Sequence, residues 1–103
     1  MIIERVKDKN PANYCGFTPL HASARNGHLD ICKLIMAKID KKDPADNAGL
    51  TPLHEAACFG HLDVCKFIID VVDNKHPIDY YGKTPKNLAD DGNFVEISKL
   101  FKS

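Results

Sequence analysis

Histidine and cysteine recur together in this chain at a spacing that could bind a metal ion. Three pairs are each four residues apart: His28–Cys32, His54–Cys58 and His61–Cys65. On a helix this spacing places both side chains on one face. Imidazole and thiolate are zinc ligands, but a structural zinc site needs four converging groups. Each pair offers only two, so the arrangement of the pairs in the fold decides whether they can act together.

The chain repeats itself with a period of 33 residues. The shift aligns Gly16 with Gly49 and Gly82, Thr18-Pro19 with Thr51-Pro52 and Thr84-Pro85, and Gly27-His28 with Gly60-His61, without insertion or deletion. His61–Cys65 is therefore the His28–Cys32 pair one unit later. Packed neighbouring helices lie about 10 Å apart, which is too far for two such pairs to share one ion. We predict no metal site and no cofactor.

Each unit reads as two short helices joined by a turn. The threonine is a typical N-cap residue, and proline suits the first helical position. In the middle unit the first helix should run from Thr51 to about residue 58, and Gly60 should supply a left-handed turn. A second helix should begin near His61, or near His28 in the unit before, with its apolar residues on roughly one face: Leu62, Val64, Cys65, Ile68, Ile69 and Val72. Neither helix can bury that face alone, so the units must stack.

The motifs GFTPLH at 16–21 and GLTPLH at 49–54, repeating at this period, resemble the ankyrin repeat family. The resemblance spans essentially the whole chain. It implies an all-α fold, a short solenoid of stacked helix–turn–helix units joined by hairpin-like turns. We expect a single domain over 1–103, with a partial repeat at 1–15, repeats at 16–48 and 49–81, and a C-terminal capping repeat at 82–103.

The two ends depart from the repeat pattern. In the last unit the motif reads GKTPKN, with Lys86 and Asn87 in place of Leu and His, and Asn93 occupies the glycine position of the turn. Polar residues suit a solvent-facing cap, and asparagine tolerates the left-handed conformation. At the other end the first residues align with a second helix and include three apolar residues, Ile2, Ile3 and Val6. We expect a fragment of a longer array that self-associates through that end, and a naturally short chain is the alternative.

Composition restricts the class of partner and the compartment. The 14 Lys and Arg residues balance the 14 Asp and Glu residues, so the basic excess of a nucleic-acid binder is missing. No apolar run approaches the roughly 20 residues of a membrane span, and the charged start is unlike a signal peptide. The four cysteines contain no C-x-x-C motif. We expect an intracellular protein, cytoplasmic or nuclear, with Cys32 and Cys65 buried and Cys15 and Cys58 exposed.

Catalytic motifs are lacking as well, since there is neither a glycine-rich phosphate loop nor a G-x-S-x-G sequence. The resemblance implies that the motif histidines tie a loop to a helix and that the Gly-His histidines act between units. We therefore assign a structural role to one set of residues: Thr18, Pro19, His21, Gly27, His28, Thr51, Pro52, His54, Gly60, His61, Thr84 and Pro85. His54 and Cys58 are predicted to be architecture, and the chain is predicted not to be an enzyme.

Positions that differ between units are where a partner can be specified. Five of the eight aromatic residues fall on such positions, in the turn tips and the first helices: Tyr14, Phe17, Phe59, Tyr80 and Tyr81. Exposed aromatics are enriched among interface hot spots. The resemblance implies a concave recognition face there, with these candidates: Tyr14, Phe17, Arg25, Asn47, Leu50, Glu55, Phe59, Tyr80, Tyr81 and Lys83. We predict a non-catalytic module that binds a protein partner. The alternative is a structural spacer or terminal cap of a longer array.

Overall fold

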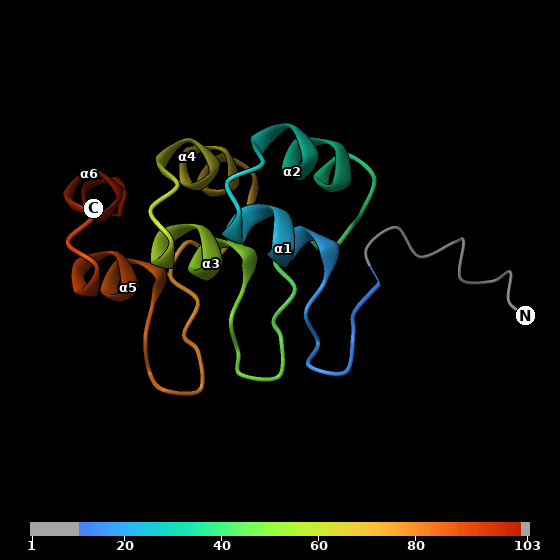
Figure 1. Cartoon of the computed structure of the whole chain (residues 1–103), viewed down its shortest axis with the longest axis horizontal. Coiled ribbons are helices and arrows are strands. Elements are labelled where there is room, and N and C mark those ends of the chain that lie inside the picture. Colours follow the sequence, from blue (N-terminus) through green and yellow to red (C-terminus); the bar gives the residue numbers. More distant parts are fainter. Residues whose placement is uncertain (1–10, 102–103) are drawn as a thin grey trace, which may run out of the picture.

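The computed structural model describes residues 11–101, and in that range it contains six helices and no strand. The helices are α1 (Pro19–Arg25), α2 (Leu29–Met36), α3 (Pro52–Cys58), α4 (Leu62–Val71), α5 (Pro85–Asp91) and α6 (Val95–Leu100). They form two layers, with α1, α3 and α5 in one row and α2, α4 and α6 in the other (Figure 1). Three long loops extend from the first row on the side away from the second. The all-α stack predicted from the sequence is confirmed.

The first helix of each unit begins at a capping box. The Thr51 hydroxyl accepts from the backbone N–H of His54, and the His54 ring accepts from the N–H of Thr51, with Pro52 opening the helix. These reciprocal bonds satisfy two of the N–H groups that a helix start leaves free. The other two units repeat the arrangement at Thr18 and Thr84. The predicted ends of the α3 helix, near residues 51 and 58, are confirmed.

Left-handed residues end the first helices, as the sequence indicated. Gly27 and Gly60 have φ angles of 74° and 78°, and Asn93 has a φ of 62° at the same place in the last unit. An added Cβ atom at Gly60 would lie 2.7 Å from the ring of Phe94. The turn therefore needs glycine for its close approach to the next unit as well as for its backbone conformation.

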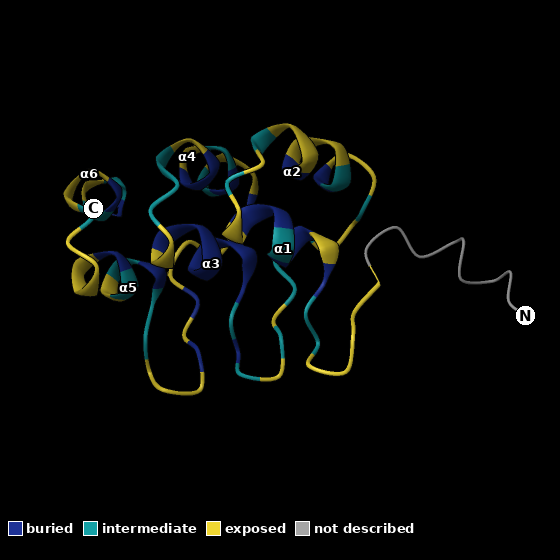
Figure 2. Cartoon of the chain, viewed as in Figure 1, coloured by how far each residue is buried: buried dark blue, intermediate teal, exposed yellow. Residues whose placement is uncertain are grey.

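The core lies between the two layers and runs through all three units. α3 packs on α1 and α5, and α4 packs on α2 and α6. Figure 2 shows the resulting pattern, in which α3 is buried along most of its length while α2 exposes much of its outer side. Cys32 and Cys65 are fully buried, Phe101 is buried and Phe67 packs against the core from a half-buried position.

Two sequence-based expectations concern residues outside this description. The partial helix at Ile2, Ile3 and Val6, and the self-association expected from it, fall within residues 1–10, which the structure does not describe. Across residues 11–101, no helix has both the length and the apolar character needed to cross a membrane.

Candidate functional site

The motif histidines join each unit to the loop of the next. Nδ1 of His54 accepts from the N–H of Thr51 at 3.0 Å, so Nε2 carries the hydrogen and donates to the carbonyl oxygen of Lys83 at 2.9 Å. His21 does the same one unit earlier, with Nε2 2.7 Å from the carbonyl oxygen of Leu50. Burial lowers the pKa of His54. The ring is held neutral with both nitrogens occupied, so it is free neither to bind a metal nor to act as a base.

Within residues 11–101, the last unit has the capping box but not the hydrogen bond to a following loop. Oδ1 of Asn87 accepts from the N–H of Thr84 at 3.0 Å and so completes the capping box. Within the described residues its side chain bonds to no further loop. Among the Gly-His residues, Nε2 of His61 donates to the carbonyl oxygen of Arg25 at 2.8 Å. His28 is exposed and makes no such bond in the described range.

The loops between units are built around a residue that the sequence analysis did not single out. Oδ1 of Asp79 accepts from the backbone N–H groups of Tyr81 and Lys83. Asp46 and Asn13 hold their own loops in the same way. The signal was present, because these three residues are spaced by 33 and a short acceptor suits a turn of this kind.

Adjacent loops are also bonded to each other. The backbone N–H of Asn47 donates to the carbonyl oxygen of Cys15 at 2.8 Å, and the N–H of Tyr80 donates to that of Ala48 at 2.9 Å. The Asn47 amide adds a bond to the carbonyl oxygen of Tyr14 at 2.9 Å. The row of loops is therefore one continuous bonded edge, and Asn47 contributes to its construction.

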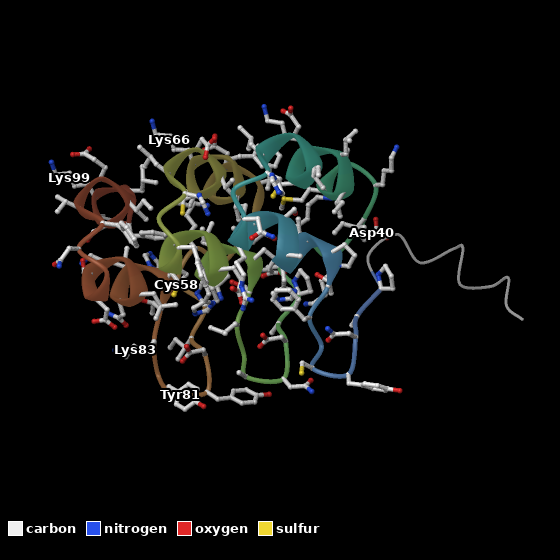
Figure 3. All side chains as sticks on the ribbon, viewed as in Figure 1. Asp40, Cys58, Lys66, Tyr81, Lys83 and Lys99 are labelled. Atoms are coloured by element: carbon white, nitrogen blue, oxygen red, sulfur yellow. The ribbon has the colours of Figure 1, made fainter. Side chains whose placement is uncertain are left out.

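Three tyrosines project from this edge. Tyr14, Tyr80 and Tyr81 are all well exposed, and Figure 3 shows Tyr81 at the tip of the loop that precedes α5. The Tyr80 ring passes close to Gly49, where an added Cβ atom would lie 2.9 Å from it. Lys83 lies on the same loop, where its ammonium bonds to Asp91 at 2.7 Å. The edge thus presents aromatic side chains from a backbone that is already ordered.

Two candidates that the sequence pattern placed at the surface are partly or fully buried in the structure. Phe17 is half-buried because its ring stacks on His21, with centroids 5.2 Å apart. The side chain of Glu55 is only 2% exposed, because α1 and α3 pack together and Oε1 of Glu55 accepts from Nε of Arg25 at 3.0 Å. Phe59, the C-cap residue of α3, is exposed as the pattern indicated.

Arg25 is the centre of an aromatic cluster on the first-helix row. Its guanidinium lies 4.8 Å from the centroid of the Phe17 ring and 5.2 Å from that of Phe59. Its side chain is 45% exposed, whereas its partner Glu55 is buried. Cation–π contacts with two rings and an ion pair with Glu55 hold the guanidinium in one place.

The last candidate, Leu50, lies on the loop before α3. Its backbone carbonyl oxygen accepts from Nε2 of His21.

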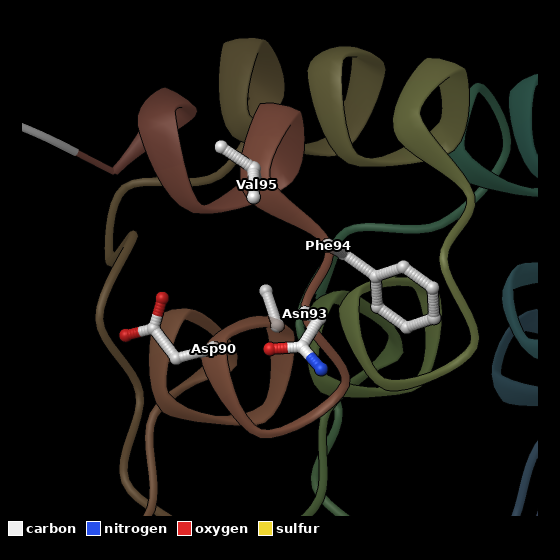
Figure 4. Close-up of a pocket in the computed structure, with 5 residues that line it drawn as sticks. Asp90, Asn93, Phe94 and Val95 are labelled. Carbon is white, nitrogen blue, oxygen red and sulfur yellow. The ribbon is translucent and has the colours of Figure 1, made fainter.

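The turn between α5 and α6 contains a small hollow (Figure 4). It has a volume of about 140 Å³ and is lined in part by Asp90, Asn93 and Phe94. Asp90 accepts from Ser98 at 2.5 Å and pairs with Lys86 at 3.0 Å. The Ser98 hydrogen bond and then Lys86 lower the pKa of Asp90. These contacts stabilise the turn and leave Asp90 little capacity for a ligand.

His54 and Cys58, one of the three His–Cys pairs four residues apart, do not form a reactive centre. Burial and then the charge of Glu55 raise the pKa of Cys58, so its thiol stays protonated. Among residues 11–101, no group of three or more His, Cys, Asp and Glu side chains is placed to hold a metal ion. The histidine is used by the fold and the cysteine lies beside it at the surface.

Comparison with known proteins agrees with this construction. A family model described as ankyrin repeats, in three copies, matches residues 1–79. The chain belongs to the ankyrin repeat family. No curated protein matches it. Ankyrin repeats are generally protein–protein interaction modules and are typically not catalytic. The unit at α5 and α6, which lies beyond the matched residues, has the same capping box.

Proposed function

We propose that this chain is a non-catalytic module that binds a protein partner through its loop tips and first-helix face. The observation that carries the proposal is the exposure of Tyr14, Tyr80 and Tyr81 on one bonded edge. Tyrosine offers a large contact area with few rotatable bonds, and loops that are ordered in advance lose little entropy on binding. Partner recognition therefore belongs to this edge and to the helix row beside it, where Arg25 and Phe59 lie.

The experiment is partner capture with two matched variants. Tyr14→Ala combined with Tyr81→Ala removes aromatic area from the edge, and both side chains are exposed, so stability should change by less than about 0.5 kcal/mol each. Leu34→Ala combined with Val95→Ala removes exposed apolar area from the other helix layer. Proteins bound from a cell lysate would be identified by mass spectrometry.

A protein retained by the wild type and by the Leu34/Val95 variant, but lost from the tyrosine variant, supports the proposal. Retention by the tyrosine variant and loss from the other would place the interface on the second-helix layer instead. If all three retain nothing, the alternative of a spacer or cap in a longer array is favoured. No contact among residues 11–101 favours that alternative over partner binding, so it stays secondary.

The repeat boundaries and the compartment complete the proposal. We assign repeats to 16–48 and 49–81, a capping repeat to 82–103 and a partial repeat to 1–15. An intracellular location, in cytoplasm or nucleus, is supported by four cysteines that are all free. Neither nucleic acid nor a membrane surface is the proposed partner, because the 14 basic and 14 acidic residues leave no basic excess to neutralise phosphate groups.

A further inference from the structure

A second hollow on the first-helix row has room for a single side chain. It has a volume of about 270 Å³, and its walls include the apolar side chains of Leu50, Phe59 and Leu88 together with the buried Glu55. Sites for small molecules generally have volumes of about 300–1,000 Å³. This hollow is smaller, and it opens on the same face as Arg25, where the proposed function places the partner.

Glu55, one of the lining residues, has a carboxylate oxygen without a hydrogen-bond partner in the part of the chain that the structure describes. Oε1 of Glu55 accepts from Nε of Arg25, but Oε2 is buried and has no hydrogen-bond partner among the described residues. It is the single buried side-chain oxygen or nitrogen in residues 11–101 left in this state. Leaving a buried polar atom unpaired costs about 1–3 kcal/mol, and more for a charged group. Folded proteins satisfy most such groups with protein or water donors, so this oxygen is available to a donor from outside the chain.

The charges around the hollow favour a cation. Glu55 and Asp79 each contribute a carboxylate, and Arg25 is the single cation among the lining residues. His54 is neutral near pH 7, since burial lowers its pKa. Burial and the nearby Glu55 raise the pKa of Cys58, so its thiol is neutral too. The ammonium of Lys83 is engaged by Asp91. The lining therefore carries one net negative charge.

We propose that this hollow receives a lysine side chain of the protein partner, and that the side chains around Oε2 of Glu55 shift on binding so that the ammonium donates to this oxygen. The inference rests on the proposed function and names the chemistry that it recognises. The methylene stem of lysine fits the apolar walls made by Leu50, Phe59 and Leu88. A guanidinium is best matched by two acceptor oxygens, and Arg25 already holds Oε1, so the one free oxygen suits the point charge of an ammonium better.

The test is a nuclear magnetic resonance titration of the whole chain with a lysine blocked at both backbone ends as acetyl and methylamide. We expect saturable shifts of the amide signals of Leu50, Glu55, Phe59 and Leu88, with a dissociation constant on the order of millimolar. The same probe with an acetylated side-chain amine should shift these signals at least about five-fold less. This comparison needs no variant, so a folding defect cannot confuse it.

Two substitutions then locate the charge. Glu55→Gln should weaken the binding of the lysine probe at least about five-fold, while Glu96→Gln, on the exposed side of α6, should leave it unchanged. Shifts produced equally by the acetylated probe would show an apolar slot and overturn the inference. Shifts produced only by a blocked glutamate would assign the site to Arg25 and overturn it as well, and so would no shift at all.

Failure here is separable from failure of the proposed function. The probe titration does not use the loop tyrosines, so the Tyr14/Tyr81 variant should bind the lysine probe as the wild type does. A chain that captures a partner through those tyrosines but ignores the lysine probe would keep the proposed function and lose this inference. A chain that binds the lysine probe but captures no partner would keep the lysine site and lose the proposed function.

Discussion

Nε2 of His54 lies 2.9 Å from the carbonyl oxygen of Lys83, 29 residues further along the chain, and this contact fastens one repeat to the loop of the next. His21 and Leu50 make the same contact one unit earlier. The histidine must be neutral to complete its capping box, because Nδ1 accepts from the N–H of Thr51. Attachment of the Lys83 loop to the repeat before it is therefore linked to the protonation state of the His54 ring.

We expect stability to fall with pH below neutrality because of this ring. The folded-state pKa of His54 is lowered from its ordinary value of 6.5, chiefly by burial. Its contribution to stability is thus complete above pH 6.5 and decreases as the pH falls through 6.5 toward the lowered folded value, since the unfolded chain takes up the proton first. One proton changes the unfolding free energy by at most about 1.4 kcal/mol per pH unit.

Urea unfolding between pH 7.5 and 4.5 measures this, with His54→Asn as the control. Asn87 shows that asparagine completes the same capping box. At pH 7.5 the unfolding free energy of the variant should be about 1 kcal/mol lower, because the hydrogen bond to Lys83 is lost. Its stability should also depend less on pH. An unchanged pH dependence would contradict the assignment to His54.

Comparing substitutions at two glycines distinguishes the cost of backbone strain from the cost of a steric clash. Gly82 and Gly60 have nearly equal φ angles of 79° and 78°, but an added Cβ atom meets nothing within 4 Å at Gly82 and the Phe94 ring at 2.7 Å at Gly60. Gly82→Ala should cost about 1–2 kcal/mol from the backbone alone. Gly60→Ala should cost at least about 1 kcal/mol more. Placing Gly60→Ala in a Phe94→Ala background should remove most of the difference, and an undiminished cost there would contradict the steric explanation.

The pair of Arg25 and Glu55 should show strong coupling. Arg25→Met keeps the apolar stem near Phe17 and Phe59 but leaves the buried carboxylate without its partner, so we expect a loss of about 2 kcal/mol. The same substitution in a Glu55→Gln background should cost less than about 1 kcal/mol, because no buried charge is left uncompensated. Equal costs in both backgrounds, measured by urea unfolding, would mean that the ion pair contributes little.

Thiol reactivity should divide the cysteines into two classes. Burial and the charge of Asp63 raise the pKa of Cys65 to about 12, and burial raises the pKa of Cys32. With a disulfide reagent at pH 8, the exposed Cys15 and Cys58 should react in the folded chain, Cys58 slowly because its thiol pKa is raised, and the other two only after unfolding. Mass spectrometry of labelled peptides identifies the sites. Reaction of all four thiols without denaturant would contradict the core described for α2 and α4.

The repeat and its helices could be predicted from the sequence because their determinants are local. Thr51 and Pro52 are adjacent, so the N-cap and the first helical position were readable from the letters alone, whereas the return bond from His54 appeared only in the structure. The left-handed residues Gly60 and Asn93 are also visible as residue types at the repeat spacing. The loop acceptors Asn13, Asp46 and Asp79 share that spacing and could have been found in the same way.

The surface residues were harder to predict, because their exposure depends on contacts between units. Glu55 occupies a variable first-helix position, yet its side chain is buried by a partner 30 residues away. Phe17 looks like an exposed loop aromatic but stacks on His21. Tyr14 and Tyr81, by contrast, meet no such neighbour and are exposed as the pattern indicated.

The sequence by itself determined the period of 33 residues, because the motifs recur without insertion, and it placed the first helix of the middle unit from capping and turn residues a few positions apart. The family resemblance carried by those motifs then implied the all-α class. Only the tertiary structure decided that Glu55 and Arg25 meet and that one carboxylate oxygen lies beside a hollow without a partner. The physical reason is that stacking brings together side chains from successive units. No local pattern states which variable residue faces its counterpart and which faces solvent.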